Sequence, residues 1–360
     1  MRALVITPRI DPHDDLLGFA HTWICQLASR VERLYVLQLW ASRSTGHGTR
    51  PVSLPANTIL YSMGKDGGAS KAEQLLRFTR VLGALCLQRR VDAVLAHMGP
   101  IFAVCAAPFA RAAGLPLVLW YAHGAVSPTL RLAHALVDRV GTSSPAGFRL
   151  PSRKVHYTGQ GIDTDRFLPP AAEPVDGPLV SIGRISPVKD YETLLRALAR
   201  LREAGLCPRL EIVGGTRRPS EARYLESLRS LSAELELSGQ VAFRSGVPHQ
   251  AVAPLYQRSA LFVSASRTGS LDKAVLEALA CSRIAITCNE AFAELFGADS
   301  ARYTFPTGDA EALSERLACT LRMEPQDRRE RGLALRRRVM AEHSVGHLAD
   351  EIVALLGPKC

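Results

Sequence analysis

The sequence has no hydrophobic run long enough to cross a membrane. Its longest apolar run, from Ile101 to Ala110, contains Pro108 and is well short of the roughly 18 residues that a spanning helix needs. The N-terminus passes from Arg2 directly into a β-branched segment, without a long apolar stretch or a small-residue cleavage site. We therefore expect neither a secretory signal nor a transmembrane helix, and we expect a cytoplasmic location.

Paired cysteine motifs are also absent. The 8 Cys residues are scattered without a CxxC pair, and several lie in apolar segments where a thiol behaves as a small hydrophobe. Zinc-ligand spacings are missing too. One Asp-x-Asp pair, Asp163 and Asp165, has a spacing that suits a divalent ion, but its setting in GIDTDRF favours a turn. These patterns predict a reduced protein with no metal and no other cofactor.

Common nucleotide and acyl-enzyme motifs are missing as well. No GxGxxG follows a candidate strand and no GxxxxGK[ST] is present, which disfavours a dinucleotide oxidoreductase and a P-loop enzyme. Two SxxK patterns, at Ser186 and Ser270, lack the SDN and KTG elements of serine acyl-enzymes.

Acidic residues are fewer than basic ones, since 34 Asp and Glu face 44 Lys and Arg, giving a net charge of +10. This excess predicts an anionic partner such as a nucleotide phosphate, an acidic membrane surface or nucleic acid. Nucleic acid is disfavoured because no helix-turn-helix, zinc or RNA-recognition signature is present. Six Arg residues between 328 and 338 predict an exposed basic helix face, with a membrane-facing patch as the alternative.

The 360 residues favour two domains, because single hydrophobic cores stop growing at roughly 250–300 residues. Short, fully apolar runs alternate with longer amphipathic stretches in both halves, which is typical of parallel, doubly wound α/β sheets. Expected strands are 3–7, 34–40, 57–61, 93–96, 117–121, 139–143, 179–182, 210–213, 241–243, 261–264, 284–287 and 302–304. Expected helices in the first half are 18–30, 70–90, 100–113 and 128–138.

A Pro-rich segment, 168–178, interrupts this alternation and predicts a linker. We therefore expect an N-terminal Rossmann-like domain at 1–167 and a second one at 179–340. The last segment, 341–360, is expected to be a helix that packs back toward the N-terminal domain.

The segment 179–202, LVSIGRISPVKDYETLLRALARLR, carries the first candidate site. Ser186 and Pro187 predict an N-cap and first helical position. This places Arg184 and Lys189 near a helix N-terminus, where backbone N–H groups favour a phosphate. The alternative is that both are solvent-exposed loop charges.

The segment 261–280, LFVSASRTGSLDKAVLEALA, carries the second. Gly269 and Ser270 predict a tight turn after a strand, and Asp272 falls in the first turn of the next helix. Glu277 lies in an otherwise apolar helix, where burial without a partner would be costly. Its carboxylate suits the two hydroxyls of a ribose, and the alternative is a structural salt bridge.

GRISPVKD, followed about ninety residues later by TGSLDKAVLEALAC, resembles glycosyltransferase family 4, whose fold is GT-B. Three further segments extend the resemblance over most of the chain: GQGIDTDRF (159–167), WYAHG (120–124) and EIVGG (211–215). The resemblance implies two Rossmann-like doubly wound domains facing an interdomain cleft.

The resemblance also implies roles for individual residues. Arg184 and Lys189 would bind the diphosphate of a nucleotide-sugar and Glu277 the ribose, while His123 would face the donor sugar. Gly18 matches the family's N-terminal glycine loop. The family's first Glu, eight residues before Glu277, is replaced by Gly269. The sugar contacts of that Glu would pass to the segment of Ser270, Leu271 and Asp272.

The resemblance therefore implies a metal-independent, retaining glycosyltransferase that moves a hexose from a UDP- or GDP-type sugar to a glycan, lipid-linked or small-molecule acceptor. We expect a role in surface polysaccharide or glycoconjugate biosynthesis, with peripheral membrane attachment. Alternatives are a catalytically silent nucleotide-sugar-binding protein, a GT-B phosphorylase or an epimerase.

Overall fold

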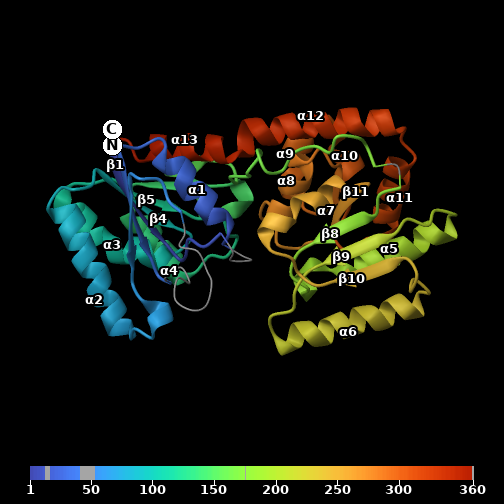
Figure 1. Ribbon diagram of the computed structural model, residues 1–360, viewed down its shortest axis with the longest axis horizontal. Helices are drawn as coiled ribbons and strands as arrows, with labels where there is room; N and C mark the ends of the chain where they lie inside the picture. The colour runs from blue at the N-terminus through green and yellow to red at the C-terminus, as the bar shows by residue number, and fades with distance from the viewer. Residues whose placement is uncertain (13–16, 41–52, 175, 359–360) are drawn as a thin grey trace. The chain divides into compact units, whose positions relative to one another are not determined.

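The computed structural model describes residues 1–12, 17–40, 53–174 and 176–358. The chain divides into two compact units (Figure 1). Unit 1 comprises Met1–Gly161 with Val345–Cys360, and unit 2 comprises Ile162–Ser344. The chain thus passes between the units at 161–162 and at 344–345. The sequence analysis expected these domain boundaries at 167–179 and at 340–341.

Unit 1 contains a parallel sheet of seven strands in the order β3-β2-β1-β4-β5-β6-β7. Chain order reverses between β1 and β4, which is the topological switch point of a Rossmann-like sheet. The strands are β1 (Arg2–Thr7), β2 (Arg33–Gln38), β3 (Thr58–Ser62), β4 (Ala93–His97), β5 (Leu117–Trp120), β6 (Arg139–Thr142) and β7 (Val155–Tyr157).

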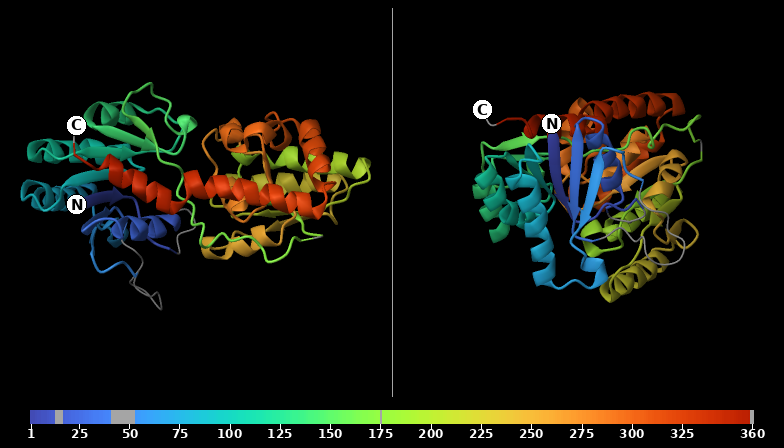
Figure 2. Two further views of the ribbon diagram at one scale, coloured as in Figure 1. Left: turned by 90° about the horizontal axis from the view of Figure 1, so that it is seen from above. Right: turned by 60° about the vertical axis from the view of Figure 1, so that its left-hand side comes forward.

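Helices cover both faces of this sheet. Helices α1 (Phe19–Ala28) and α13 (Val345–Leu355) pack side by side on one face, around the core that contains Trp23 and Leu348 (Figure 2). On the other face, Phe78 and Phe102 belong to a second core built by three helices. These are α2 (Lys71–Leu82), extended by a π-helical turn at Gly83–Leu87, α3 (Pro100–Ala113) and α4 (Pro128–Leu136).

Unit 2 contains a parallel sheet of five strands in the order β10-β9-β8-β11-β12, and its switch point lies between β8 and β11. The strands are β8 (Leu179–Ile182), β9 (Leu210–Val213), β10 (Val241–Arg244), β11 (Leu261–Ser264) and β12 (Ala285–Thr287). The helices are α5 (Tyr191–Glu203), α6 (Pro219–Glu234), α7 (Ala253–Gln257), α8 (Lys273–Ala280), α9 (Ala293–Phe296), α10 (Ser300–Tyr303), α11 (Ala310–Leu321) and α12 (Pro325–His343). The structure confirms two Rossmann-like doubly wound domains.

Two sequence predictions differ from the structure at the ends of the sheets. The expected strand 302–304 is wrong, because Ser300–Tyr303 form a helical turn and Thr304 makes only an isolated bridge to Thr287. The sequence also did not reveal β7. His156 and Tyr157 are exposed on this edge strand, so it lacks the apolar run that marks the buried strands.

The Pro-rich segment 168–178, of which residue 175 lies outside the described residues, contains no helix or strand in its described part. It is fastened to unit 2 by Glu173, which pairs with Arg283 at 2.6 Å and with Arg328 at 3.2 Å. Arg336 donates to the carbonyl oxygens of Phe167 and Ala280. The predicted exposed basic face is therefore wrong for Arg328 and Arg336, which are buried because they bind these acceptors.

Within the described residues, no helix has both the length and the apolar character that membrane crossing requires.

Candidate functional site

The candidate donor-site residues of unit 2 follow β8 and β11, the two strands that flank its switch point. Arg184 and Lys189 come after β8, and the segment from Gly269 to Glu277 comes after β11. Ligands of open α/β sheets bind beyond the carboxyl ends of strands at such a point. The ends of β8 and β9 approach closely, since a Cβ on Gly214 would lie 1.9 Å from the Gly183 carbonyl oxygen.

Arg184 lies in the turn after β8 with its side chain 44% exposed. Its Nε is 3.5 Å from Oε1 of Glu221, which is the third residue of α6. A backbone N–H bond from Arg217 at 2.6 Å, followed by the charge of Arg184, lowers the pKa of Glu221. Arg184 is thus oriented by an ionised carboxylate while much of its guanidinium stays open to a ligand.

Lys189 does not lie in the first turn of α5, so the predicted helix start is wrong. Pro187–Lys189 form a 3₁₀ turn, and Asp190 follows in the left-handed region with φ of +49° before α5 begins at Tyr191. Arg267 Nη2, at 2.6 Å, and Thr193 Oγ1, at 2.9 Å, hold the Asp190 carboxylate in this conformation. The side chain of Ser186 makes no capping bond, and its buried Oγ has no partner within the described part of the chain.

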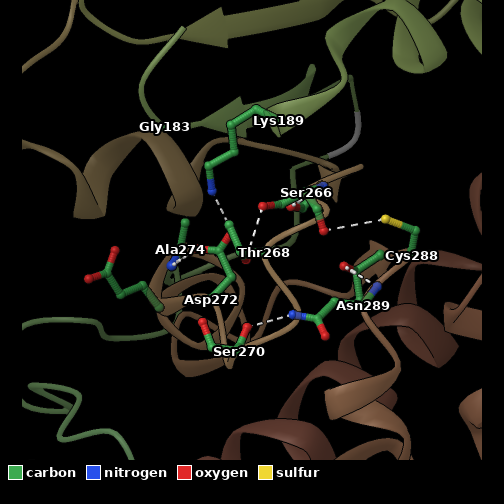
Figure 3. Close-up of polar contacts among 12 residues, drawn as sticks. Gly183, Lys189, Ser266, Thr268, Ser270, Asp272, Ala274, Cys288 and Asn289 are labelled. Carbon is green, nitrogen blue, oxygen red and sulfur yellow. Dashed lines mark hydrogen bonds and ion pairs between the residues drawn. The ribbon is translucent and has the colours of Figure 1, made fainter. Parts of the chain in front are cut away.

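The Lys189 ammonium binds Asp272, with Nζ 2.6 Å from Oδ2 (Figure 3). The other oxygen, Oδ1, accepts a bond from the Ala274 N–H and caps α8. Asp272 therefore joins the turn after β8 to the helix after β11. The structure brings these two predicted residues together as an ion pair.

The loop between β11 and α8 is held by its own backbone conformation and by a side chain that follows β12. Gly269 adopts φ of +67°, a conformation that side-chain-bearing residues rarely adopt. Asn289 Nδ2 donates to the Ser270 carbonyl oxygen at 2.6 Å (Figure 3). Asn289 is buried after β12, and the sequence did not indicate this role. Leu271 is buried next to these residues along the chain.

Glu277 is 6% exposed and uses both carboxylate oxygens. Oε1 lies 2.9 Å from His249 Nε2, and Oε2 accepts a bond from the Tyr256 hydroxyl at 3.1 Å. Burial, together with the charge of Glu277, raises the pKa of Tyr256 well above its usual value. Since a carboxylate offers about four lone-pair sites, Glu277 retains capacity for two ligand hydroxyls.

The residues predicted to act from unit 1 are Gly18 and His123. Gly18 precedes α1 with helical φ and ψ of −54° and −29°, so its backbone conformation does not require glycine. His123 is exposed after β5, and its Nδ1 accepts a bond from the Ala125 N–H at 3.1 Å. Neutral His123 therefore carries its proton on Nε2, which makes it a hydrogen-bond donor rather than a base.

Asp163, the first residue of the Asp-x-Asp pair with Asp165, lies in a turn. Asp163 Oδ1 accepts a bond from the Arg166 N–H at 3.2 Å, as in a turn. Across residues 1–12, 17–40, 53–174 and 176–358, no group of three or more His, Cys, Asp or Glu side chains is arranged to hold a metal ion.

Residues 172–333 match the family described as glycosyl transferases group 1. The chain is 27% identical over 189 residues to WcaL of Escherichia coli (strain K12), which is assigned as a colanic acid biosynthesis glycosyltransferase. It is 29% identical over 206 residues to a GDP-mannose-dependent alpha-(1-6)-phosphatidylinositol monomannoside mannosyltransferase of Mycolicibacterium smegmatis. These matches cover 49% and 48% of this chain, and the chain spans about half the length of these relatives, 44% and 52%.

Solved structures resemble the whole chain. Sucrose-phosphate synthase from Thermosynechococcus elongatus superposes with a TM-score of 0.75 at 18% identity, covering 98% of both chains. Anabaena HepE in complex with UDP superposes with a TM-score of 0.74 at 16% identity, covering 99% of both. Its complex with UDP-glucose gives a TM-score of 0.71, also at 16% identity and 99% coverage of both. These likenesses show that the chain has the GT-B fold.

Proposed function

We propose that the protein is a retaining, metal-independent glycosyltransferase of family 4 type. It moves a hexose from a UDP- or GDP-type sugar to a glycan, lipid-linked or small-molecule acceptor in surface polysaccharide or glycoconjugate biosynthesis. The observation that carries this proposal is the convergence of Arg184, Lys189 and Glu277 on the switch point of unit 2. This unit contains the whole of the segment that matches group 1 glycosyltransferases.

Arg184 and Lys189 are the cations that would bind the diphosphate. Each is held by a carboxylate, Glu221 and Asp272, so both are oriented before a ligand arrives. Charge builds on the leaving diphosphate in the transition state, and preorganised cations stabilise it there. In the proposed front-face mechanism the leaving phosphate accepts the acceptor proton. His123, a donor through Nε2, would orient the donor sugar.

UDP and GDP are the favoured donor nucleotides because of the relatives. HepE has been crystallised with UDP and UDP-glucose, and the mycobacterial relative is named GDP-mannose-dependent. Unit 2 would bind the donor and unit 1 the acceptor.

We further propose peripheral attachment to an anionic membrane through unit 1. Unit 1 has 19 basic and 10 acidic residues, a net charge of +9, whereas unit 2 has 25 and 24, a net charge of +1. Leu75 and Leu76 on α2 are 54% and 48% exposed, and Lys71 and Arg80 are exposed on the same helix. This combination suits an anionic lipid surface.

A thermal-shift panel of UDP-, GDP-, ADP- and CMP-sugars, with and without chelator, tests the donor assignment. A ligand that binds only the folded protein raises Tm. We expect a chelator-insensitive rise with one nucleotide in the wild type, lost in Arg184→Ala/Lys189→Ala and kept in Arg337→Ala, an exposed control on α12. No rise with any donor would contradict the assignment.

A turnover assay with the same donors separates transfer from binding alone. Release of the nucleoside diphosphate in the presence of acceptor supports transfer. If the protein binds the donor but neither transfers the sugar nor slowly hydrolyses the donor, it is instead a silent sugar-binding protein. This is the second candidate function because position 269 is a glycine.

A further inference from the structure

The loops that follow β5 and β6 form one connected surface in unit 1. The two strands are parallel neighbours, so both loops leave the same edge of the sheet. The Tyr121 N–H donates to the Gly141 carbonyl oxygen, and the His123 N–H donates to that of Gly147, each at 2.9 Å. The loop that carries His123 is thus held by the main chain of the loop that ends near Arg149.

The guanidinium of Arg149 lies close to Gly124, in the loop that carries His123. A Cβ on Gly124, the residue after His123, would lie 3.0 Å from Cζ and 3.1 Å from Nε of Arg149. Position 124 therefore leaves room for the guanidinium because it is glycine. Arg149 is exposed. Among the carboxylates in the described ranges, none lies within ion-pair distance of Arg149.

Three consecutive hydroxyls at the end of β6 need partners. Thr142, Ser143 and Ser144 are 0%, 3% and 7% exposed, and their hydroxyl oxygens have no hydrogen-bond partner among the described residues. Two of them lie beside Gly147, whose Cβ would be 2.7 Å from Thr142 Oγ1 and 3.3 Å from Ser143 Oγ. Buried hydroxyls without partners are costly, so they favour a polar ligand or bound water.

The surrounding chain is strongly basic. Residues 117–161 include five Lys and Arg and one acidic residue, Asp138. The Asp138 carboxylate already accepts a bond from the Leu117 N–H at 2.8 Å. The region therefore attracts an anion with little competition from its own carboxylates.

We propose that this surface binds a phosphate group carried by the acceptor, through the Arg149 guanidinium and the Ser143 and Ser144 hydroxyls. Guanidinium binds phosphate in a bidentate manner, and hydroxyls add donors to its oxygens. The site lies next to His123, which places the acceptor beside the residue assigned to the donor sugar. That the bound molecule is the sugar acceptor rests on the proposed function, whereas phosphate binding at this surface does not.

The first test titrates the full chain with inorganic phosphate and follows the imidazole NMR signals of His123, assigned with His123→Gln. We expect a saturable shift in the wild type and in the matched control Arg153→Gln, an exposed arginine of the same unit. Binding should weaken about tenfold or more in Arg149→Gln, since a charge-assisted contact is lost. The absence of a saturable shift, or equal binding in all three proteins, overturns the proposal.

Repeating the titration in Arg184→Ala/Lys189→Ala separates this site from the donor site. The His123 shift should be retained. Its loss would assign the phosphate to unit 2 and overturn the proposal.

The second test compares KM values for a polyprenyl-diphosphate-linked sugar, a soluble sugar phosphate and the same sugar without phosphate. Arg149→Gln should raise KM about tenfold for whichever phosphorylated acceptor is used and leave the donor KM unchanged. That acceptor identifies the source of the phosphate. Equal changes in donor and acceptor KM contradict the acceptor assignment. Absence of transfer together with a retained His123 shift instead refutes the proposed function alone.

Discussion

The carboxylate of Glu277 accepts hydrogen bonds from two side chains that lie on α7 and in the turn before it. Tyr256 and His249 lie 21 and 28 residues earlier in the sequence. The apolar neighbours of Glu277 indicate that it needs partners, but no sequence spacing indicates which. The sequence could therefore predict a buried carboxylate that needs partners, whereas the identity of those partners required the fold.

Tyr256→Phe removes one of these bonds and keeps the ring. We expect the free energy of unfolding to fall by about 1.5–3 kcal/mol, the usual contribution of a hydrogen bond to a charged group. Donor affinity should also fall, because Glu277 becomes less fixed. Urea unfolding and calorimetric donor titration measure the two effects. Tyr157→Phe, at a 57% exposed tyrosine, is the control. Unchanged stability in Tyr256→Phe would refute the role of this bond.

Lys273 gives the stability of unit 2 a pH dependence. Burial lowers the pKa of its buried ammonium from 10.5 to about 7, although the charge of Glu277 opposes the shift. Between these two values the unfolded chain binds a proton that the folded chain does not. Stability therefore rises with pH across this window.

Lys273→Met should remove this dependence. The stability of the wild type relative to the variant should increase by about 3 kcal/mol between pH 7 and pH 9.5, at about 1.36 kcal/mol per unit of pKa difference. Urea unfolding at both pH values measures it, with Lys71→Met, at an exposed lysine, as the control. A constant difference between wild type and Lys273→Met would show that Lys273 is charged in the folded protein at pH 7.

At the scale of elements, the buried strands were predictable because burial on both faces requires an apolar run. Leu210–Val213 and Leu261–Ser264 match their predicted bounds. The start of α5 was not predictable from Ser186 and Pro187. Its position depends on Asp190, whose left-handed backbone is held by Arg267 from a distant loop.

The loop between β11 and α8 explains why a glutamate at position 269 would not simply restore the first Glu of the glycosyltransferase family 4 pattern that the sequence resembles. The backbone there has φ of +67°, which costs about 1–2 kcal/mol for a residue with a Cβ. Gly269→Ala and Gly269→Glu should therefore both lower Tm, by about the same amount. Gly215→Ala, at an exposed glycine with open space around it, should not.

The affinity of the two Gly269 variants for the nucleotide-sugar is a second measurement. We expect Gly269→Glu to bind the nucleotide-sugar no more tightly than Gly269→Ala, because the strained turn misplaces the new carboxylate. If Gly269→Glu instead bound the nucleotide-sugar more tightly than the wild type, the turn would adapt to the new side chain, and the absence of a Glu at position 269 would limit donor binding in the wild type.

At the scale of the whole molecule, the net charge of +10 was available from the sequence, but its distribution was not. The division into units assigns +9 of it to unit 1. The sequence predicted an exposed basic face for the arginines of α12, with a membrane-facing patch as the alternative, but two of these arginines are buried in unit 2. Arg337 and Arg338 remain exposed there. Charge alone therefore does not decide whether α12 or α2 faces the membrane. The exposed leucines on α2 favour α2 in our proposal.

Vesicle co-sedimentation with anionic and neutral lipid at low salt tests this choice with two variants of equal charge change. Lys71→Gln/Arg80→Gln on α2 should weaken binding to anionic vesicles by roughly thirtyfold, at about 1 kcal/mol for each of the two basic residues near the surface. Arg337→Gln/Arg338→Gln on α12 should have little effect. Leu75→Ser/Leu76→Ser should weaken binding without changing charge, because the apolar contribution is lost. Equal losses in the two charge variants would mean that net charge alone drives attachment. Indifference of the wild type to anionic vesicles would refute peripheral attachment itself.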